Sequence, residues 1–294
     1  MSDLRLIRES FFSCLRRWVR APRVLLLFGF IACLTVTCAV PFAANARLQG
    51  EKLQFAEIWI ALMNWRFSML AFSTIVIFLF GELPIVDPFS LNTLLRGTRR
   101  LWLAGQILYV LAASLALCLL ILASTLLAAL PNLTFSNEWS RPVRMMAYSG
   151  RIAIPPEQLK LSMSAEILEL YSPWAAFGHS AALFYLLCCL YGLSALALRI
   201  QWPSGGFIQL VVANVLSWSM GALMPTSAGY AVLAAVSPHY HASLSAHFVH
   251  SVNPHAPTLE VSYGVLLGVI LGIVVFASVR VKRYDFCLSE GEQE

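Results

Sequence analysis

The long apolar stretches of this chain limit its fold more than any other feature. Several of them run for about 20 residues without a charged side chain, the helical length that crosses the hydrocarbon core of a bilayer. Of the 294 residues, 59% are hydrophobic and 12% are charged, and the charges gather between the apolar runs. A soluble domain typically carries about twice that charged fraction. The sequence therefore predicts an integral membrane protein.

The apolar runs are predicted to be α-helices, because only a helix satisfies every backbone polar group within its own segment in hydrocarbon. The alternating pattern of membrane β-strands is absent from them. We predict an all-α fold, a single transmembrane domain over residues 1–294. Its six spans are expected at 24–43, 62–83, 102–130, 173–198, 206–224 and 261–279.

Basic residues predict the orientation of the chain, because cytoplasmic segments are enriched in Lys and Arg. Most of the 20 basic residues lie in four places: 1–23, 96–100, Arg199 and 280–283. Both chain ends, including the tail 280–294, are therefore predicted to be cytoplasmic, which agrees with an even number of spans. The segments 131–172 and 225–260 are then external.

The segment 1–22 has the pattern of an amphipathic helix. Apolar residues recur every three or four positions, which places them on one helical face: Leu4, Ile7, Phe11, Leu15, Trp18 and Val19. Arginines occupy the rest, so the helix is expected to lie on the membrane surface. It is either a simple anchor or an elbow that braces a moving bundle.

The connector 82–100 carries a short apolar helix on the cytoplasmic side. Asp87 followed by Pro88 favours a helix start, and Gly97 favours its end. An exposed apolar helix suggests docking to another protein, although an interfacial helix in the lipid headgroups has the same pattern. The residues proposed to couple this helix to a partner are Asp87, Pro88, Phe89, Leu91, Asn92, Leu94, Leu95, Arg96, Arg99 and Arg100.

Three stretches carry a family resemblance. DPFSLNTLLRGTRRLWLAGQIL (87–108) resembles the connection between the second and third spans of the type-2 family of ABC exporter permeases. VSPHYHASLSAHFVHSVN (236–253) is similar to the family's segment between spans five and six, and VRVKRYDF (279–286) resembles its tail. Permeases of the nitrous-oxide-maturation and gliding-motility type are the most similar in character. The loop 131–172 is longer than is typical of them.

The resemblance implies an exporter permease in a bacterial cytoplasmic (inner) membrane, multi-pass, with the helix at 87–96 seated in a cytoplasmic ABC-type ATPase subunit. It also implies pairing with a second permease copy or a sister permease. The sequence contains no GxxxxGK[ST] pattern, so ATP and Mg are expected on the ATPase and no cofactor on this chain. We therefore expect a permease subunit and not an enzyme.

Polar residues within the predicted spans are candidates for a translocation path: Ser73, Thr74, Gln209, Asn214 and Ser217. The resemblance places spans two and five at the dimer axis, beside the route. Helix–helix packing through small and hydrogen-bonding residues is the alternative. The resemblance also makes 225–260 an external re-entrant hairpin that caps the path, with gate residues Pro225, Pro238, His239 and His241.

Histidines in the same external segment raise the possibility of a metal site. His239, His241, His247 and His250 offer imidazole ligands, and protonation would make them acid sensors. A wet gate with hydrogen-bonding side chains explains them equally simply, and we predict no metal site.

Other functions find less support in the sequence. Neither an HExxH motif nor a complete nucleophile elbow is present, and no basic–aromatic array suggests nucleic acid. An ATP-independent secondary transporter, a membrane enzyme that works alone and a membrane assembly or structural subunit remain the alternatives. Coupled carriers usually hold a charge at mid-span, and the predicted spans show none.

Overall fold

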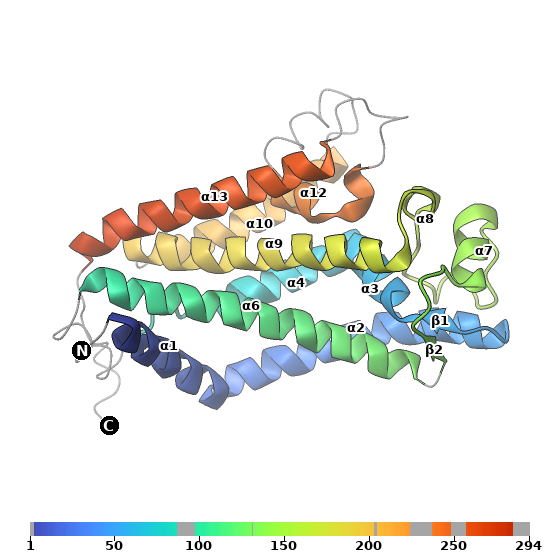
Figure 1. Cartoon of the computed structure of the whole chain (residues 1–294), viewed down its shortest axis with the longest axis horizontal. Coiled ribbons are helices and arrows are strands. Elements are labelled where there is room, and N and C mark those ends of the chain that lie inside the picture. Colours follow the sequence, from blue (N-terminus) through green and yellow to red (C-terminus); the bar gives the residue numbers. More distant parts are fainter. Residues whose placement is uncertain are drawn as a thin grey trace.

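The computed structural model describes residues 3–86, 98–130, 132–202, 205–223, 237–247 and 257–284. Four long helices lie side by side along the length of the molecule (Figure 1). They are α2 (Pro22–Leu48), α6 (Arg99–Ala129), α9 (Pro173–Gln201) and α13 (Leu259–Arg280). Each is long and apolar enough to cross a membrane.

A bent pair adds up to one more span within the described part of the chain. It consists of α3 (Phe55–Asn64) and α4 (Arg66–Leu79), which meet at 83°. Helix α10 (Gly206–Leu223) is also apolar, over the shorter stretch Gly206–Met220. The prediction of a multi-helix, membrane-compatible fold is thus confirmed at this level, whereas the count of six spans stays a prediction.

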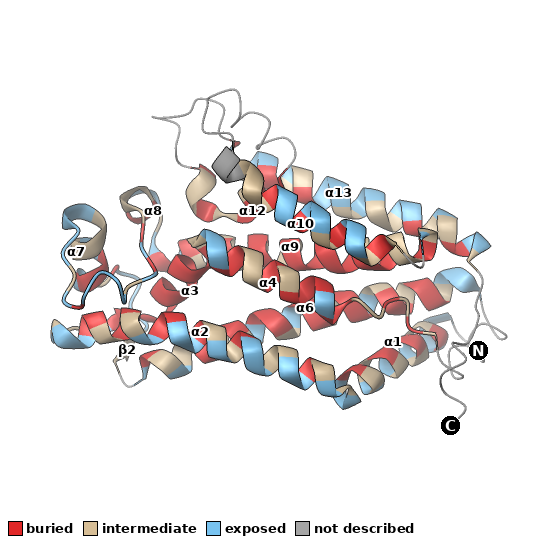
Figure 2. Cartoon of the chain, turned by 180° about the vertical axis from the view of Figure 1, so that it is seen from behind, coloured by how far each residue is buried: buried red, intermediate tan, exposed pale blue. Residues whose placement is uncertain are grey.

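Helix α9 occupies the middle of the bundle and is the most deeply buried of the long helices (Figure 2). Helices α6, α13, α10 and α4 all pack on it. Gly192 permits the close approach, because a Cβ there would lie 2.6 Å from a methyl carbon of Val110 on α6. Helix α13 is the opposite case: most of it is exposed, and a Cβ added at Gly264, Gly268 or Gly272 would meet nothing.

Our predicted span at 62–83 was wrong as a single helix, because the chain breaks at Trp65. Trp65 has extended backbone angles and ends α3 while it precedes α4. Ser68 donates to the carbonyls of Leu62 and Trp65, and the Asn64 amide donates 2.7 Å to the Ile60 carbonyl. These side chains satisfy carbonyls near the break, which would otherwise be costly to bury.

Helix α1 (Asp3–Arg20) confirms the predicted N-terminal helix, but the predicted apolar face was wrong in part, because only Trp18 of it is buried. It packs on α6 through Leu6, Ser10, Cys14 and Trp18. The Ser10 hydroxyl donates 3.1 Å to the carbonyl of Trp102, and the contact is close because residue 105 is a glycine. Leu4 and Val19 from the predicted face remain exposed.

The opposite end of the bundle holds a small folded cap. Strand β1 (Leu53–Gln54) pairs in parallel with β2 (Leu133–Thr134), and two short helices follow, α7 (Arg141–Ser149) and α8 (Ala165–Leu170). Helix α8 leads into Pro173, the first residue of α9.

One buried carboxylate joins this cap to the bundle. Glu57 on α3 is fully buried, and it accepts hydrogen bonds from the Ser140 N–H at 2.6 Å, the Ser140 hydroxyl at 2.8 Å and the Gln54 N–H at 3.0 Å. Ser140 is the residue that precedes α7. The carboxylate therefore fixes the start of α7 onto α3.

Candidate functional site

A cluster of polar side chains lies where α4, α9 and α10 meet the short helix α12 (Pro238–Ala242). The sequence starts α12 there because Ser237 caps it, accepting from the Tyr240 N–H at 3.4 Å, and Pro238 fits the first turn without needing its missing N–H. This short helix carries His239 into the bundle.

His239 is the centre of a hydroxyl–imidazole network. Its Nε2 lies 3.0 Å from the Ser73 hydroxyl on α4, and its Nδ1 lies 3.0 Å from the Ser217 hydroxyl on α10. The Tyr191 hydroxyl on α9 is 3.5 Å from the same Nδ1. Ser237 completes the network, with its oxygen 2.9 Å from that of Ser217. All five residues are buried.

Burial also sets the charge of this imidazole. His239 lies on α12, which is not among the candidate membrane-spanning helices. Its burial away from water lowers the pKa of its imidazole to about 4. The ring is therefore neutral near pH 7, with one nitrogen that donates and one that accepts. The network thus offers neutral donors and acceptors inside an apolar bundle.

A second cluster lies beside the first. The Ser262 hydroxyl on α13 is 2.9 Å from His241 Nδ1 and 2.8 Å from Nε2 of His247, which belongs to η1 (Leu244–His247). Two imidazoles that share one hydroxyl form a hydrogen-bonded bridge between α12, η1 and α13. Among the described residues, no group of three or more His, Cys, Asp or Glu side chains could hold a metal.

The remaining candidate path residues divide into two groups. Asn214 is fully buried, and its amide donates 3.0 Å to the hydroxyl of Thr74, which links α10 to α4. Its side-chain oxygen has no hydrogen-bond partner among the described residues. Gln209 lies instead on the exposed face of α10, away from the network. Four of the five candidate path residues therefore form hydrogen bonds between helices, Ser73 and Ser217 through His239 and Thr74 directly with Asn214.

Other candidate residues fall outside the described residues: 87–96, Pro225 and His250. The end of the coupling segment is described. Arg99 donates to the carbonyls of Lys282 at 2.5 Å and Tyr284 at 3.1 Å, which ties the start of α6 to η3 (Val281–Arg283) and the residue after it. Arg100 is exposed beside it.

Sequence reasoning missed three members of the two clusters, namely Tyr191, Ser237 and Ser262. A tyrosine in the middle of a predicted span carries a hydroxyl that needs a partner, and this signal could have identified Tyr191. Ser237 before Pro238 has the pattern of a helix cap, which hides its second role toward Ser217. Nothing in the sequence distinguishes Ser262 from other serines near span ends.

Comparison of the chain with protein-family models, with curated proteins and with solved structures finds no match in any of the three.

Proposed function

We propose that this chain is the membrane permease subunit of an ATP-driven exporter, with ATP hydrolysed by a separate cytoplasmic subunit. The observation that carries the proposal is the anchoring of both flanks of the segment 87–97 to one end of the bundle. On one flank, the Gln106 side chain bonds the N–H and the carbonyl of Ile85, each at 3.3 Å. On the other flank, Arg99 bonds the chain after α13.

The same end carries α1 and a dense set of charges. Glu82 at the end of the bent pair lies 2.5 Å from Arg23 and 3.8 Å from Arg17. These contacts hold α1, α2 and the connector together, so a push on the connector would reach several helices as a unit. Such rigid coupling is what a permease needs if a partner's ATPase cycle is to move its helices.

The interior network supports a transport role over a purely structural one. Polar groups at membrane depth tend to face a path or another helix, and here three hydroxyls contact His239, with the buried, unpartnered amide oxygen of Asn214 one helical turn before Ser217. The substrate would pass a surface of neutral hydrogen-bonding groups.

Co-purification tests the proposal. The full chain, expressed with its cytoplasmic neighbours, should bring down a soluble ATPase, and the double variant Phe89→Glu with Leu94→Glu should lose it. Leu170→Glu, at an exposed position in α8, is the matched control and should keep it. An unchanged complex in the double variant would refute the coupling role.

Two further measurements separate the alternatives. Transport by the purified chain in liposomes without ATP would favour a secondary carrier. If Ser217→Leu leaves export by the assembled complex unchanged, the network is structural and an assembly role is favoured.

A further inference from the structure

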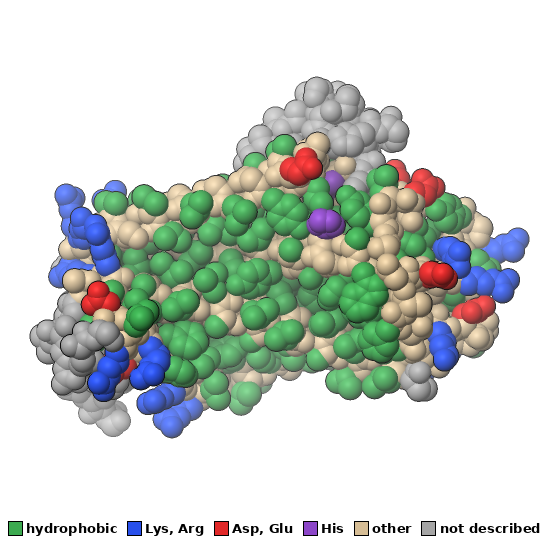
Figure 3. All heavy atoms as spheres, in the orientation of Figure 1, with side chains coloured by type: hydrophobic (Ala, Val, Ile, Leu, Met, Phe, Trp, Pro, Cys, Tyr) green, Lys and Arg blue, Asp and Glu red, His purple; other side chains and the backbone are tan. Residues whose placement is uncertain are grey.

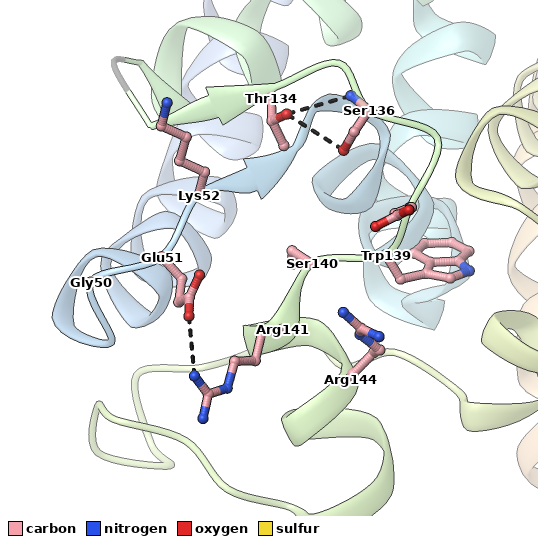
Figure 4. A pocket seen from close by; sticks show the side chains of 10 residues that line it. Gly50, Glu51, Lys52, Thr134, Ser136, Trp139, Ser140, Arg141 and Arg144 are labelled. Carbon is pink, nitrogen blue, oxygen red and sulfur yellow. Dashed lines mark hydrogen bonds and ion pairs between the residues drawn. The ribbon is translucent and has the colours of Figure 1, made fainter.

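The capped end of the bundle contains an open pocket of about 490 Å³ (Figure 4). It lies between the turn after α2, the strand β2 and the beginning of α7. This volume is in the range of cavities that hold small molecules. The pocket shares no lining residue with the His239 network, and what it binds does not depend on the proposed ATPase partner.

The lining of the pocket carries an excess of positive charge. Three cations (Lys52, Arg141 and Arg144) face two carboxylates, those of Glu51 and Glu138. Arg141 forms an ion pair with Glu51 at 3.4 Å, drawn as a dashed line in Figure 4. Within the described part of the chain, Lys52 and Arg144 form no ion pair, so both can contact a ligand, although the charge of Arg144 also acts on the buried Glu57 carboxyl.

The pocket is preformed. The buried Glu57 carboxylate holds Ser140 from below, and Trp139 forms a wall fixed by its indole N–H, which donates 2.9 Å to the Tyr171 carbonyl. The Thr134 hydroxyl lies 3.5 Å from the Ser136 hydroxyl on the rim. The guanidinium groups of Arg141 and Arg144, the Lys52 ammonium and these hydroxyls suit an oxyanion such as phosphate.

Two exposed apolar residues lie close to lining residues in the sequence, although neither lines the pocket itself. Phe135 lies between two lining residues and is 63% exposed, with one ring face stacked on Phe55. Leu48, two residues before the lining residue Gly50, is 67% exposed. On the face in Figure 3, the charged end that holds this cap adjoins the apolar belt. A molecule with a charged head and an apolar tail matches both surfaces at once.

We propose that this pocket binds the headgroup of a zwitterionic phospholipid, the phosphoethanolamine type. The phosphate contacts Lys52 and Arg144, the ammonium contacts Glu138, and the acyl chains pass over Phe135 and Leu48. The carboxylate distinguishes this headgroup from an anionic one, because a purely anionic headgroup would meet Glu138 without a compensating cation.

Native mass spectrometry of the full chain in detergent tests the proposal. Equal concentrations of phosphatidylethanolamine, phosphatidylglycerol and diacylglycerol are added. The unaltered protein should retain phosphatidylethanolamine best and diacylglycerol least. Lys52→Ala and Arg144→Ala should each weaken binding of phosphatidylethanolamine about tenfold or more, since each removes a charged hydrogen-bond donor. Glu138→Gln should abolish the preference over phosphatidylglycerol.

Arg151→Ala is the matched control, because Arg151 is an exposed cation just after α7 that does not line the pocket. The proposal is overturned if Arg151→Ala weakens binding as much as Arg144→Ala does, or if diacylglycerol binds as well as the phospholipids. A separate arm adds inorganic phosphate alone and follows chemical modification of Arg144. If phosphate protects Arg144 and phosphatidylethanolamine does not, the pocket takes free phosphate and the lipid assignment is wrong.

Discussion

The buried Glu57 carboxylate makes a sharp prediction about how the cap is held. Glu57→Gln keeps the shape of the side chain but replaces one acceptor oxygen with an NH₂ group. Whichever oxygen is replaced, at least one of the groups on Ser140 and Gln54 that donate to Glu57 then faces the new NH₂ group, which cannot accept its hydrogen bond. Loss of one charge-assisted hydrogen bond, together with a buried donor left unsatisfied, costs about 2–4 kcal/mol.

Because Ser140 begins α7, the cost should appear first as local opening of the cap. Amide hydrogen exchange of α7 in the purified protein should quicken by roughly 30- to 700-fold, since each 1.4 kcal/mol is tenfold. Peptides from α1, at the other end of the molecule, should exchange as before.

Glu51→Gln is the control for this experiment. It also removes a carboxylate that contacts the α7 segment, but its partner Arg141 is exposed and 3.4 Å away. Such a surface pair contributes about 0–1 kcal/mol. Equal exchange of α7 in the two variants would refute the view that Glu57 anchors the cap, and faster exchange of α1 in Glu57→Gln would show global unfolding instead.

Three further predictions concern the bundle. Gly192→Val should lower the midpoint of thermal unfolding by overpacking, at about 1–3 kcal/mol, whereas Gly268→Val, which meets open space, should leave it unchanged. The contribution of the neutral His239 ring to stability is full above its pKa in the unfolded chain, about 6.5, and is lost as the pH falls toward its pKa in the folded protein, about 4. Acidification over this range should therefore lower the free energy of unfolding of the unaltered protein by up to about 3 kcal/mol more than that of the His239→Gln variant. Gly105→Val should displace Ser10, detach α1 and expose it to protease.

The sequence predicted the long helices well because their apolar runs are unbroken and their ends are marked. Prediction of α9 from residue 173 succeeded because Pro173 fits only the first turn of a helix there. The bend at Trp65 could not be predicted, since no proline or glycine marks it. It depends on Asn64, whose oxygen also accepts from the Ser245 N–H at 2.8 Å, a contact that only the tertiary fold creates.

The same distinction explains the candidate site. Hydropathy identified Ser73 and Ser217 as polar residues within apolar runs, but it could not show that both contact one imidazole. Their meeting depends on how α4 and α10 pack around α9, and on α12 folding back between them. Gln209 is also a polar residue within an apolar run, but it lies on the exposed face of its helix, so polarity alone does not predict which residues meet.

The distribution of charge across the described bundle bears on what kind of cargo the proposed permease could move. Helices α2, α6, α9 and α13 carry charged side chains only in their first and last turns. The groups that contact His239 come from α4, α9 and α10 and are all hydroxyls, and the imidazole itself is neutral near pH 7. An ion or a strongly charged solute would have to shed its hydration without a countercharge, which is expensive at membrane depth. A neutral polar or amphipathic cargo would lose less, because hydroxyl and imidazole groups can replace its water one hydrogen bond at a time. These four helices hold no charged group at mid-span, whereas the bent pair holds Arg66 at its break and the buried Glu57 on α3. Under the proposed function, the energy for outward movement enters at the end of the bundle where the flanks of the segment 87–97 are anchored.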